Sequence, residues 1–302
     1  MTSPSATAVS SARTPSGPRG GLFRAVLRLH RTALVLWGLA LAAATAYLIW
    51  LHTIGGEARR GTSPCAIPAS DGLPSCAAVD AITADETYST GIALVTTALS
   101  YLVFPVAAWA GGALIGRELE SGTAQLAWTQ SVTPARWLAA KLAVPAALLT
   151  AGTGTLVVVN RWAQGDGNPN LVGDWYFEDV FLGIGPTAVA YPLAALALGT
   201  LTGLLLRRAL PAAGVACAAA FVLYNLLERN RENLWPTVTR SESHGFELPR
   251  SAWQLGWEGS TSATFHPRSH FWPLQYAETG IVLAVAAAAT LAAFWLLRRR
   301  TP

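Results

Sequence analysis

Six long apolar stretches constrain what this chain can fold into. Each is about 20 residues long, the length that an α-helix needs to cross the hydrocarbon core of a bilayer. Backbone groups in lipid must be hydrogen-bonded within the segment, and a helix achieves this. Only 13% of the 302 residues are charged, whereas soluble domains carry about 25%. We therefore predict an all-α integral membrane bundle of six transmembrane helices, at residues 33–54, 91–116, 142–160, 180–206, 209–227 and 275–297.

Arginine and lysine are distributed unevenly between the two sides that these spans define. The side with both termini carries thirteen basic and two acidic residues, and the opposite side carries eight basic and fourteen acidic residues. Basic residues are enriched on the cytoplasmic side of membrane proteins. We therefore predict a multi-pass protein of the cell (plasma) membrane with cytoplasmic N- and C-termini. The basic balance is then a topology signal, so we expect the lipid bilayer and not nucleic acid as a partner.

The region before the first span divides into two parts. Residues 1–20 are rich in Ser, Thr, Pro, Gly and Ala, which predicts a disordered tail. Residues 21–32 place Arg24, Arg28 and Arg31 on one helical face and apolar residues on another. This pattern is typical of an amphipathic interfacial helix, and the alternative is a cytoplasmic extension of the first span. Residues 21–302 are thus expected to form one membrane domain.

The segments on the predicted outer side read as irregular loops. The first, residues 55–87, contains Cys65 and Cys76. In an oxidising exterior these two thiols are candidates for a disulfide, although both are equally compatible with remaining free. The largest, residues 228–274, is rich in tryptophan, and some of its rings are expected at the headgroup level.

Enzymatic motifs are nearly absent. His244, His266 and His270 lie in the last outer loop, but Pro267 argues against a helix that would present the last two as metal ligands. Neither HExxH nor GxSxG occurs, and we predict no catalytic residue, no metal site and no cofactor. The sequence also lacks the GxxxxGK[ST] loop that cradles nucleotide phosphates, so the chain is not an ATPase by itself.

Two features inside the spans stand out. The fourth span carries Pro186 and Pro192, which predicts a kink or a break, and Gly199 and Gly203 in the same span favour close helix approach. Glu278 is the one acid inside a predicted span. It is either a carboxylate near a helix N-terminus that water can reach, or a residue of gating or substrate passage.

The segment 117–142 is the one internal segment of the predicted cytoplasmic side long enough to form an interacting surface. Residues 117–120 continue the second span, and Ser121 and Gly122 are a natural stop. Thr133 and Pro134 are a strong start for the next helix. Between them we expect a compact elbow with an exposed Trp128. A purely structural turn needs far fewer residues, so we predict a docking surface.

At this segment the sequence resembles a known family. RELESGT at 117–123, followed by AWTQSVTPARWLAAKL at 127–142, looks like the permease subunits of actinobacterial ABC transporters of the type-2 exporter class. FWPLQYAETG at 271–280, with an apolar run and RRR behind it, is similar to the last span of the same permeases.

The resemblance implies a permease that pairs with a separate ATP-binding subunit, with two copies of each. The second permease would be an identical copy or a paralogue. The loop between the second and third spans would act as the coupling helix, and the outer loop 228–274 would shape an extracellular gate. Carried over to this sequence, the candidate contacts with the ATP-binding subunit are Arg117, Glu118, Glu120, Ser121, Gly122, Thr123, Trp128, Thr129 and Gln130.

Two other classes of function remain open at the level of sequence. One is an integral-membrane enzyme with a site at the outer face around the three loop histidines. The other is a non-transporting membrane anchor or sensor.

Overall fold

The structure is a computed structural model. It describes residues 31–61, 79–129, 132–165, 167, 169–242, 247–258 and 261–300. The predicted tail and most of the predicted interfacial helix lie outside these residues, as do Cys65, Cys76, Gln130 and His244.

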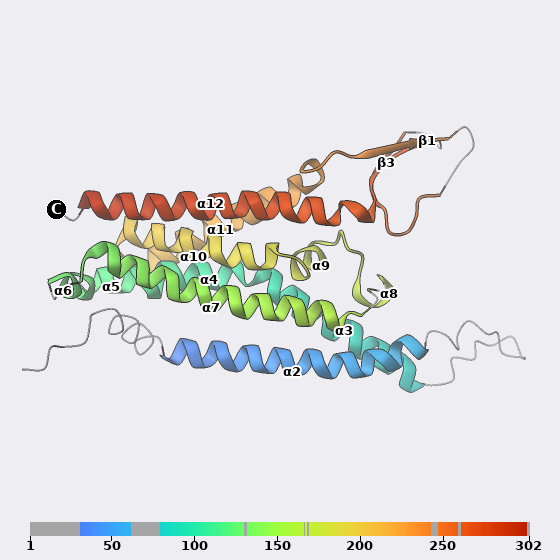
Figure 1. Ribbon diagram of the computed structural model, residues 1–302, viewed down its shortest axis with the longest axis horizontal. Coiled ribbons are helices and arrows are strands. Elements are labelled where there is room, and N and C mark those ends of the chain that lie inside the picture. The colour runs from blue at the N-terminus through green and yellow to red at the C-terminus, as the bar shows by residue number, and fades with distance from the viewer. Residues whose placement is uncertain are drawn as a thin grey trace, which may run out of the picture.

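Long helices run side by side along the molecule, and the all-α prediction is confirmed (Figure 1). The helices are α2 (Arg31–Gly61), α3 (Val79–Tyr101), α4 (Val103–Trp109), the π-helix η2 (Ala110–Gly116), α5 (Arg117–Glu120), α6 (Thr123–Thr129), α7 (Pro134–Ala163), α8 (Pro169–Val172), α9 (Glu178–Gly183), α10 (Thr187–Leu206), α11 (Ala209–Asn230), the 3₁₀ turns η3 (Arg231–Asn233) and η4 (Arg268–His270), and α12 (Phe271–Arg300).

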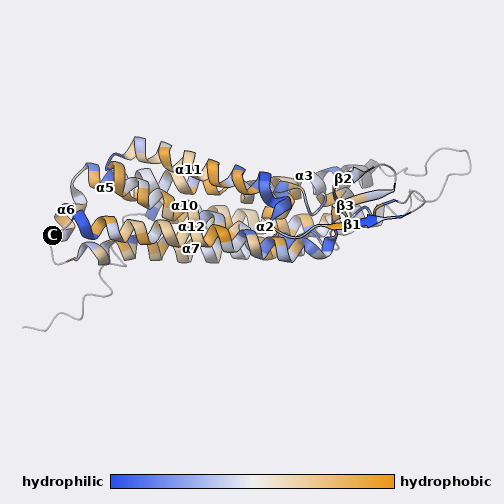
Figure 2. Ribbon diagram, turned by 90° about the horizontal axis from the view of Figure 1, so that it is seen from above, coloured by the Kyte–Doolittle hydropathy of each residue, from blue (hydrophilic) through white to orange (hydrophobic). Residues whose placement is uncertain are grey.

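Six helical segments among the described residues are long and apolar enough to cross a membrane, as predicted. They are Arg31–Gly56, Glu86–Glu120, Pro134–Ala163, Thr187–Leu206, Ala209–Asn233 and Arg268–Arg300. Hydrophobic residues line the middle of the helices and hydrophilic residues gather near both ends (Figure 2). The helices extend beyond most of the predicted apolar runs, because polar residues continue them past the expected hydrocarbon boundary.

The two ends of the bundle differ in kind. One end holds α5, α6, the start of α2 and the end of α12, together with Arg117, Arg207 and residues 298–300; we call it the basic end (Figure 1). The other end carries a three-stranded sheet, and we call it the sheet end (Figure 1). The start of α2 and the end of α12 thus lie at the same end, and its cytoplasmic placement stays a prediction.

The fourth span is broken, as its prolines predict. Helix α9 ends at Gly183 and α10 begins after Pro186, whereas Pro192 lies inside α10. The break frees backbone groups that lipid cannot satisfy. Gln275 on α12 supplies the missing partners. Its amide nitrogen donates to the Phe181 carbonyl, and its oxygen accepts from the Thr187 hydroxyl at 2.9 Å and, at 3.4 Å, from the Thr187 amide.

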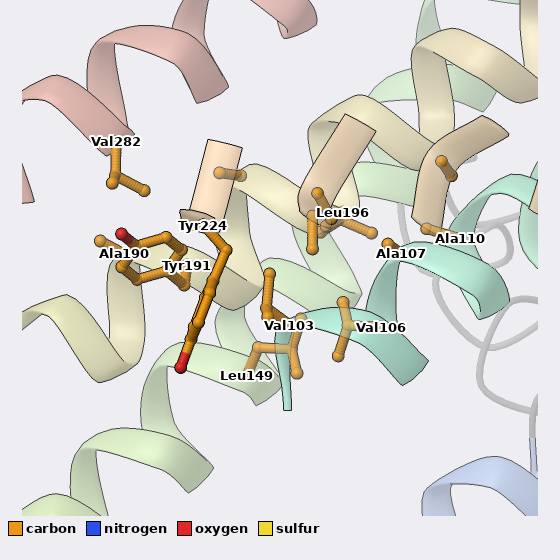
Figure 3. Packing of buried hydrophobic residues seen from close by; sticks show 14 of the residues in the cluster. Val103, Val106, Ala107, Ala110, Leu149, Ala190, Tyr191, Leu196, Tyr224 and Val282 are labelled. Carbon is orange, nitrogen blue, oxygen red and sulfur yellow. The ribbon is translucent and has the colours of Figure 1, made fainter. Parts of the chain in front are cut away.

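Helix α10 occupies the centre of the core. It has the largest buried share of the six spans. Its residues Tyr191 and Leu196 meet Val103 of α4, Tyr224 of α11 and Val282 of α12 in one apolar cluster (Figure 3). The surrounding helices therefore depend on α10 for their relative positions.

Glycines let the second span approach α10 closely, as the GxxxG spacing predicts. A Cβ added at Gly199 would lie 2.7 Å from the Ala107 carbonyl oxygen, and one at Gly203 would lie 2.8 Å from the Ile115 Cβ. On the other side of the second span, an added Cβ at Gly111 would lie 2.7 Å from a backbone oxygen of α11. The second span is therefore held between α10 and α11 by small residues.

The prediction that residues 228–274 form an irregular loop is wrong in part, because this segment contains a sheet. Strands β1 (Val238–Ser241), β2 (Trp253–Glu258) and β3 (Ser262–His266) pair antiparallel in the order β1-β3-β2. Short runs with β-branched and aromatic residues pair across the ladder, as in Val238 with Phe265. Trp253 of β2 packs against Trp175 with ring centroids 6.1 Å apart, so the sheet is fixed to the end of the bundle.

Replacing Gly199 by alanine should destabilise the protein. The added methyl group meets backbone atoms that cannot rotate away, and overpacking of this kind costs about 1–3 kcal/mol. Gly214, in the second turn of α11, is the matched control because nothing lies within 4 Å of its added Cβ. Thermal unfolding in detergent should show a lower midpoint for Gly199→Ala and no loss for Gly214→Ala. Equal midpoints would contradict the close packing of α10.

Candidate functional site

The elbow, residues 117–133, leaves the bundle at the basic end. Helix α5 continues η2 directly, and the Ser121 amide still bonds the Arg117 carbonyl at 3.0 Å. Gly122 then adopts φ +74° and stops the helix. Helix α7 begins directly after Thr133, whose side-chain oxygen accepts a hydrogen bond from the Arg136 amide at 3.4 Å. Both predicted cap positions are confirmed.

Glycine is required at position 122 by the backbone conformation and not by neighbouring atoms. No atom lies within 4 Å of an added Cβ, but a positive φ is unfavourable for other residues. Side chains hold the turn on both sides: the Ser121 and Thr123 hydroxyls are 3.0 Å apart, and Thr123 donates to the Glu118 carbonyl at 3.2 Å. Helix α6 is therefore set at a fixed angle to α5.

Glu118 connects the elbow to the third span. One carboxylate oxygen pairs with the ammonium of Lys141, and the other accepts from the indole nitrogen of Trp137 at 3.2 Å. Both partners lie on α7, and Lys141 is only 2% exposed. A charge at such depth depends on a partner, so this contact is a strong link between α5 and α7.

Glu120 connects the same helical turn to the fifth span. Its Oε2 accepts from the backbone amide of Ala209 at 2.8 Å. Ala209 is the first residue of α11, where free amides and the helix dipole favour a carboxylate. The two acids of the RELE sequence thus bind two different spans.

The prediction that Trp128 is exposed is wrong. Its ring is half-buried and meets Trp137 edge to face, with centroids 5.7 Å apart. Helix α6 folds back on the bundle because Ala124, fully buried, allows close contact. The exposed apolar side chain is instead Leu126, with 60% of its surface accessible. Leu126 is not among the predicted contact residues, because whether a side chain of this segment is exposed depends on how α6 folds back.

The predicted contact residues therefore fall into two sets. The carboxylates of Glu118 and Glu120 are engaged within the chain, whereas a set of polar and apolar residues forms the exposed face of the elbow. We call this set the α6 face; it consists of the predicted residues Ser121, Thr123 and Thr129 together with Gln125 and Leu126, which were not predicted. Arg117 is exposed beside it and Gly122 is half-exposed.

Glu278 lies in a buried ion pair at the sheet end. It is fully buried, two turns into α12, so the expectation that water reaches it is wrong. Arg231 of η3 donates to its carboxylate at 2.8 Å and 3.3 Å, and the Tyr191 hydroxyl donates at 2.7 Å. The guanidinium carbon of Arg231 also lies 4.3 Å from the ring centre of Phe181. The sequence could not reveal this pair, because Arg231 falls 47 residues earlier, in a predicted loop.

Two of the three loop histidines, His266 and His270, contact each other. The Nδ1 atoms of His266 and His270 are 2.9 Å apart, and Nε2 of His266 lies 2.9 Å from the Glu232 carbonyl oxygen. His270 belongs to a 3₁₀ turn that follows Pro267, so a continuous helix is indeed absent there. Groups of three or more His, Cys, Asp or Glu residues suited to a metal ion do not occur in the described part of the chain.

Six apolar helices with an elbow tied to two of them define a multi-pass membrane protein. A family model described as "ABC-2 membrane transporter related" matches residues 38–230, more than half of the 302-residue chain, and the chain belongs to this family. The matched part runs from the first span through α11 and includes the elbow. The protein is therefore a permease component of the ABC-2 type. No curated protein and no solved structure matches the chain.

Removing the Glu278 carboxylate should lower the free energy of unfolding of the protein. Glu278→Ala leaves Arg231 buried without its counter-ion, and breaking one side of a buried pair costs about 3–5 kcal/mol. The exposed pair of Arg240 and Glu242 offers a control, since Glu242→Ala should change stability by at most about 1 kcal/mol. The measurement is unfolding in detergent; similar losses in both variants would contradict a structural role for the buried pair.

Proposed function

We propose that this chain is the permease subunit of an ATP-driven exporter and that the elbow couples it to a separate ATP-binding subunit. The observation that supports this most directly is the double link of α5: within one helical turn, Glu118 binds α7 and Glu120 binds the start of α11. A displacement of α6 would therefore act on two spans at once. Rigid-body coupling between packed elements is a common way to transmit a conformational change.

In this proposal the α6 face forms the contact with the ATP-binding subunit, with Arg117 beside it. Leu126 is its apolar centre, and burying a leucine side chain stabilises an interface by about 1.5–3 kcal/mol. Glu118 and Glu120 transmit the movement and do not touch the partner. Gly122 sets the angle at which α6 is presented.

The proposed assembly contains two permeases and two ATP-binding subunits, as the resemblance of the elbow sequence implies. The second permease is an identical copy or a paralogue. The arginines of the basic end favour its placement in the cytoplasm, with both termini on that side of the plasma membrane. The sheet end would then face outward.

At the sheet end we propose a gating role for Glu278. The pair with Arg231 and the bond from Tyr191 join η3, α10 and α12 at one buried point. If these elements separate during export, this pair must open.

Leu126 is the residue that tests docking. Leu126→Ser should weaken binding of the ATP-binding subunit about ten-fold or more, because it removes the apolar centre of the α6 face. Leu210→Ser is a matched control, since Leu210 is an exposed leucine at the same end outside the elbow. Affinity is measured with both purified subunits in lipid nanodiscs. Equal affinities for the two variants would exclude the α6 face as the docking surface.

Variants of Glu120 test whether a movement of the elbow is transmitted to α11. Glu120→Ala removes the acceptor for the Ala209 amide while the α6 face stays intact. We expect the ATP-binding subunit to remain bound but its ATPase activity to lose stimulation by the permease. Glu120→Gln retains a carbonyl acceptor and should restore stimulation. Loss of binding in Glu120→Ala would show instead that Glu120 contacts the partner, and wild-type behaviour of both variants would contradict transmission through α11.

A further inference from the structure

A cavity of about 200 Å³ opens at the sheet end, between the ends of α7, α9 and α12. This volume has room for several water-sized groups. It is far along the bundle from the elbow, and neither the family match nor the proposed coupling gives it a role (Figure 1). Its charged residues, among the described residues that line it, are Arg161, Arg268 and Asp174, which leaves a net charge of +1.

Two buried polar atoms in its wall have no hydrogen-bond partner among the described residues. They are the side-chain amide nitrogen of Gln164 and the Oδ1 atom of Asp174. Gln164 is only 6% exposed. A buried polar group without a partner costs about 1–3 kcal/mol, so one free donor and one free acceptor in the same wall suit a ligand that accepts at one point and donates at another.

The two arginines are placed to receive an anion. Neither forms one of the ion pairs found among the described residues, which join Lys141 to Glu118, Arg231 to Glu278, and Arg240 to Glu242. The guanidinium carbon of Arg161 lies 4.9 Å from the ring centre of Trp272, a contact that orients the group. Planar guanidinium groups match phosphate and carboxylate oxygens well.

The walls of the cavity are rigid and aromatic. The indole nitrogen of Trp175 donates to the Ser251 carbonyl at 2.7 Å, so this ring is fixed and offers no polar atom of its own. Phe271 meets it edge to face at 6.1 Å. Burial first, and then the Asp174 carboxylate, raise the pKa of the nearby Tyr176 hydroxyl, so this phenol stays neutral and adds no charge.

The position of the cavity indicates which kind of anion can reach it. Trp272 and Tyr276 stack on the outside of α12 with centroids 5.6 Å apart, and both are exposed. Exposed aromatic residues at the end of a span mark the boundary between lipid and water. Phospholipid phosphates lie at this level, and in many lipids an amine follows the phosphate after two carbons.

We propose that this cavity binds a phosphate-linked primary amine, the chemistry of an ethanolamine phospholipid head group or of free phosphoethanolamine. The phosphate accepts from Arg161, Arg268 and the Gln164 amide, and the ammonium group donates to Asp174. The proposal is independent of the coupling function at the basic end.

The test compares ligands on the purified full-length protein by native mass spectrometry. Phosphatidylethanolamine should bind more tightly than phosphatidylglycerol, which carries a phosphate but no amine. Free phosphoethanolamine is titrated separately: if it binds and competes with the lipid, the head group alone is sufficient, and if only the lipid binds, the ligand is the membrane lipid. Failure of both ethanolamine compounds to bind would overturn the proposal.

Variants locate the binding in the cavity. Arg268→Gln should weaken phosphatidylethanolamine binding about ten-fold or more, since it removes a charged donor. Asp174→Asn should reduce the preference over phosphatidylglycerol. Arg229→Gln is the matched control, an exposed arginine at the same end that does not line the cavity. Thermal midpoints near that of the wild type show that the variants are folded. The assignment would be contradicted if Arg268→Gln bound phosphatidylethanolamine as the wild type does. An unchanged preference for phosphatidylethanolamine in Asp174→Asn would also contradict it.

Discussion

Polar groups within an apolar bundle need partners inside the chain, and the architecture depends on where those partners are. The break between α9 and α10 persists because Gln275 on α12 bonds to both sides of it. The charge of Arg231 is balanced by Glu278, and that of Lys141 by Glu118. Each of these contacts joins different helices, so the same interactions that satisfy polar groups also fix the arrangement of the spans.

This constraint gives the elbow its mechanical character. A helix that only emerged from the membrane would move independently of its neighbours. Here Glu118 and Glu120 fix α5 to α7 and to the start of α11, while Gly122 turns α6 to present Leu126 outward. The residues that hold the elbow and the residues that it exposes are therefore different, although they alternate within a few positions of the chain.

Much of the fold was predictable because local rules set it. Apolar length determined the six spans, proline determined the break at Pro186, and the cap residues Gly122 and Thr133 determined the ends of the elbow. The sheet was missed because its strands are short and pair across a loop that otherwise looks irregular. Trp128 was placed in solvent for a similar reason: whether an indole is exposed depends on how α6 folds back against Trp137.

The sequence by itself determined that the protein is a bundle of six membrane spans, since hydrophobic length depends only on composition and spacing, and its motifs carried the resemblance to ABC-2 permeases. Only the tertiary structure decided which polar residues act together. Arg231 and Glu278 are 47 residues apart, and Glu120 and Ala209 are 89 apart. Such pairs leave no local pattern, because the packing of whole helices brings them together. The same holds for Arg161, Asp174 and Arg268, which meet at one cavity only after the bundle has formed.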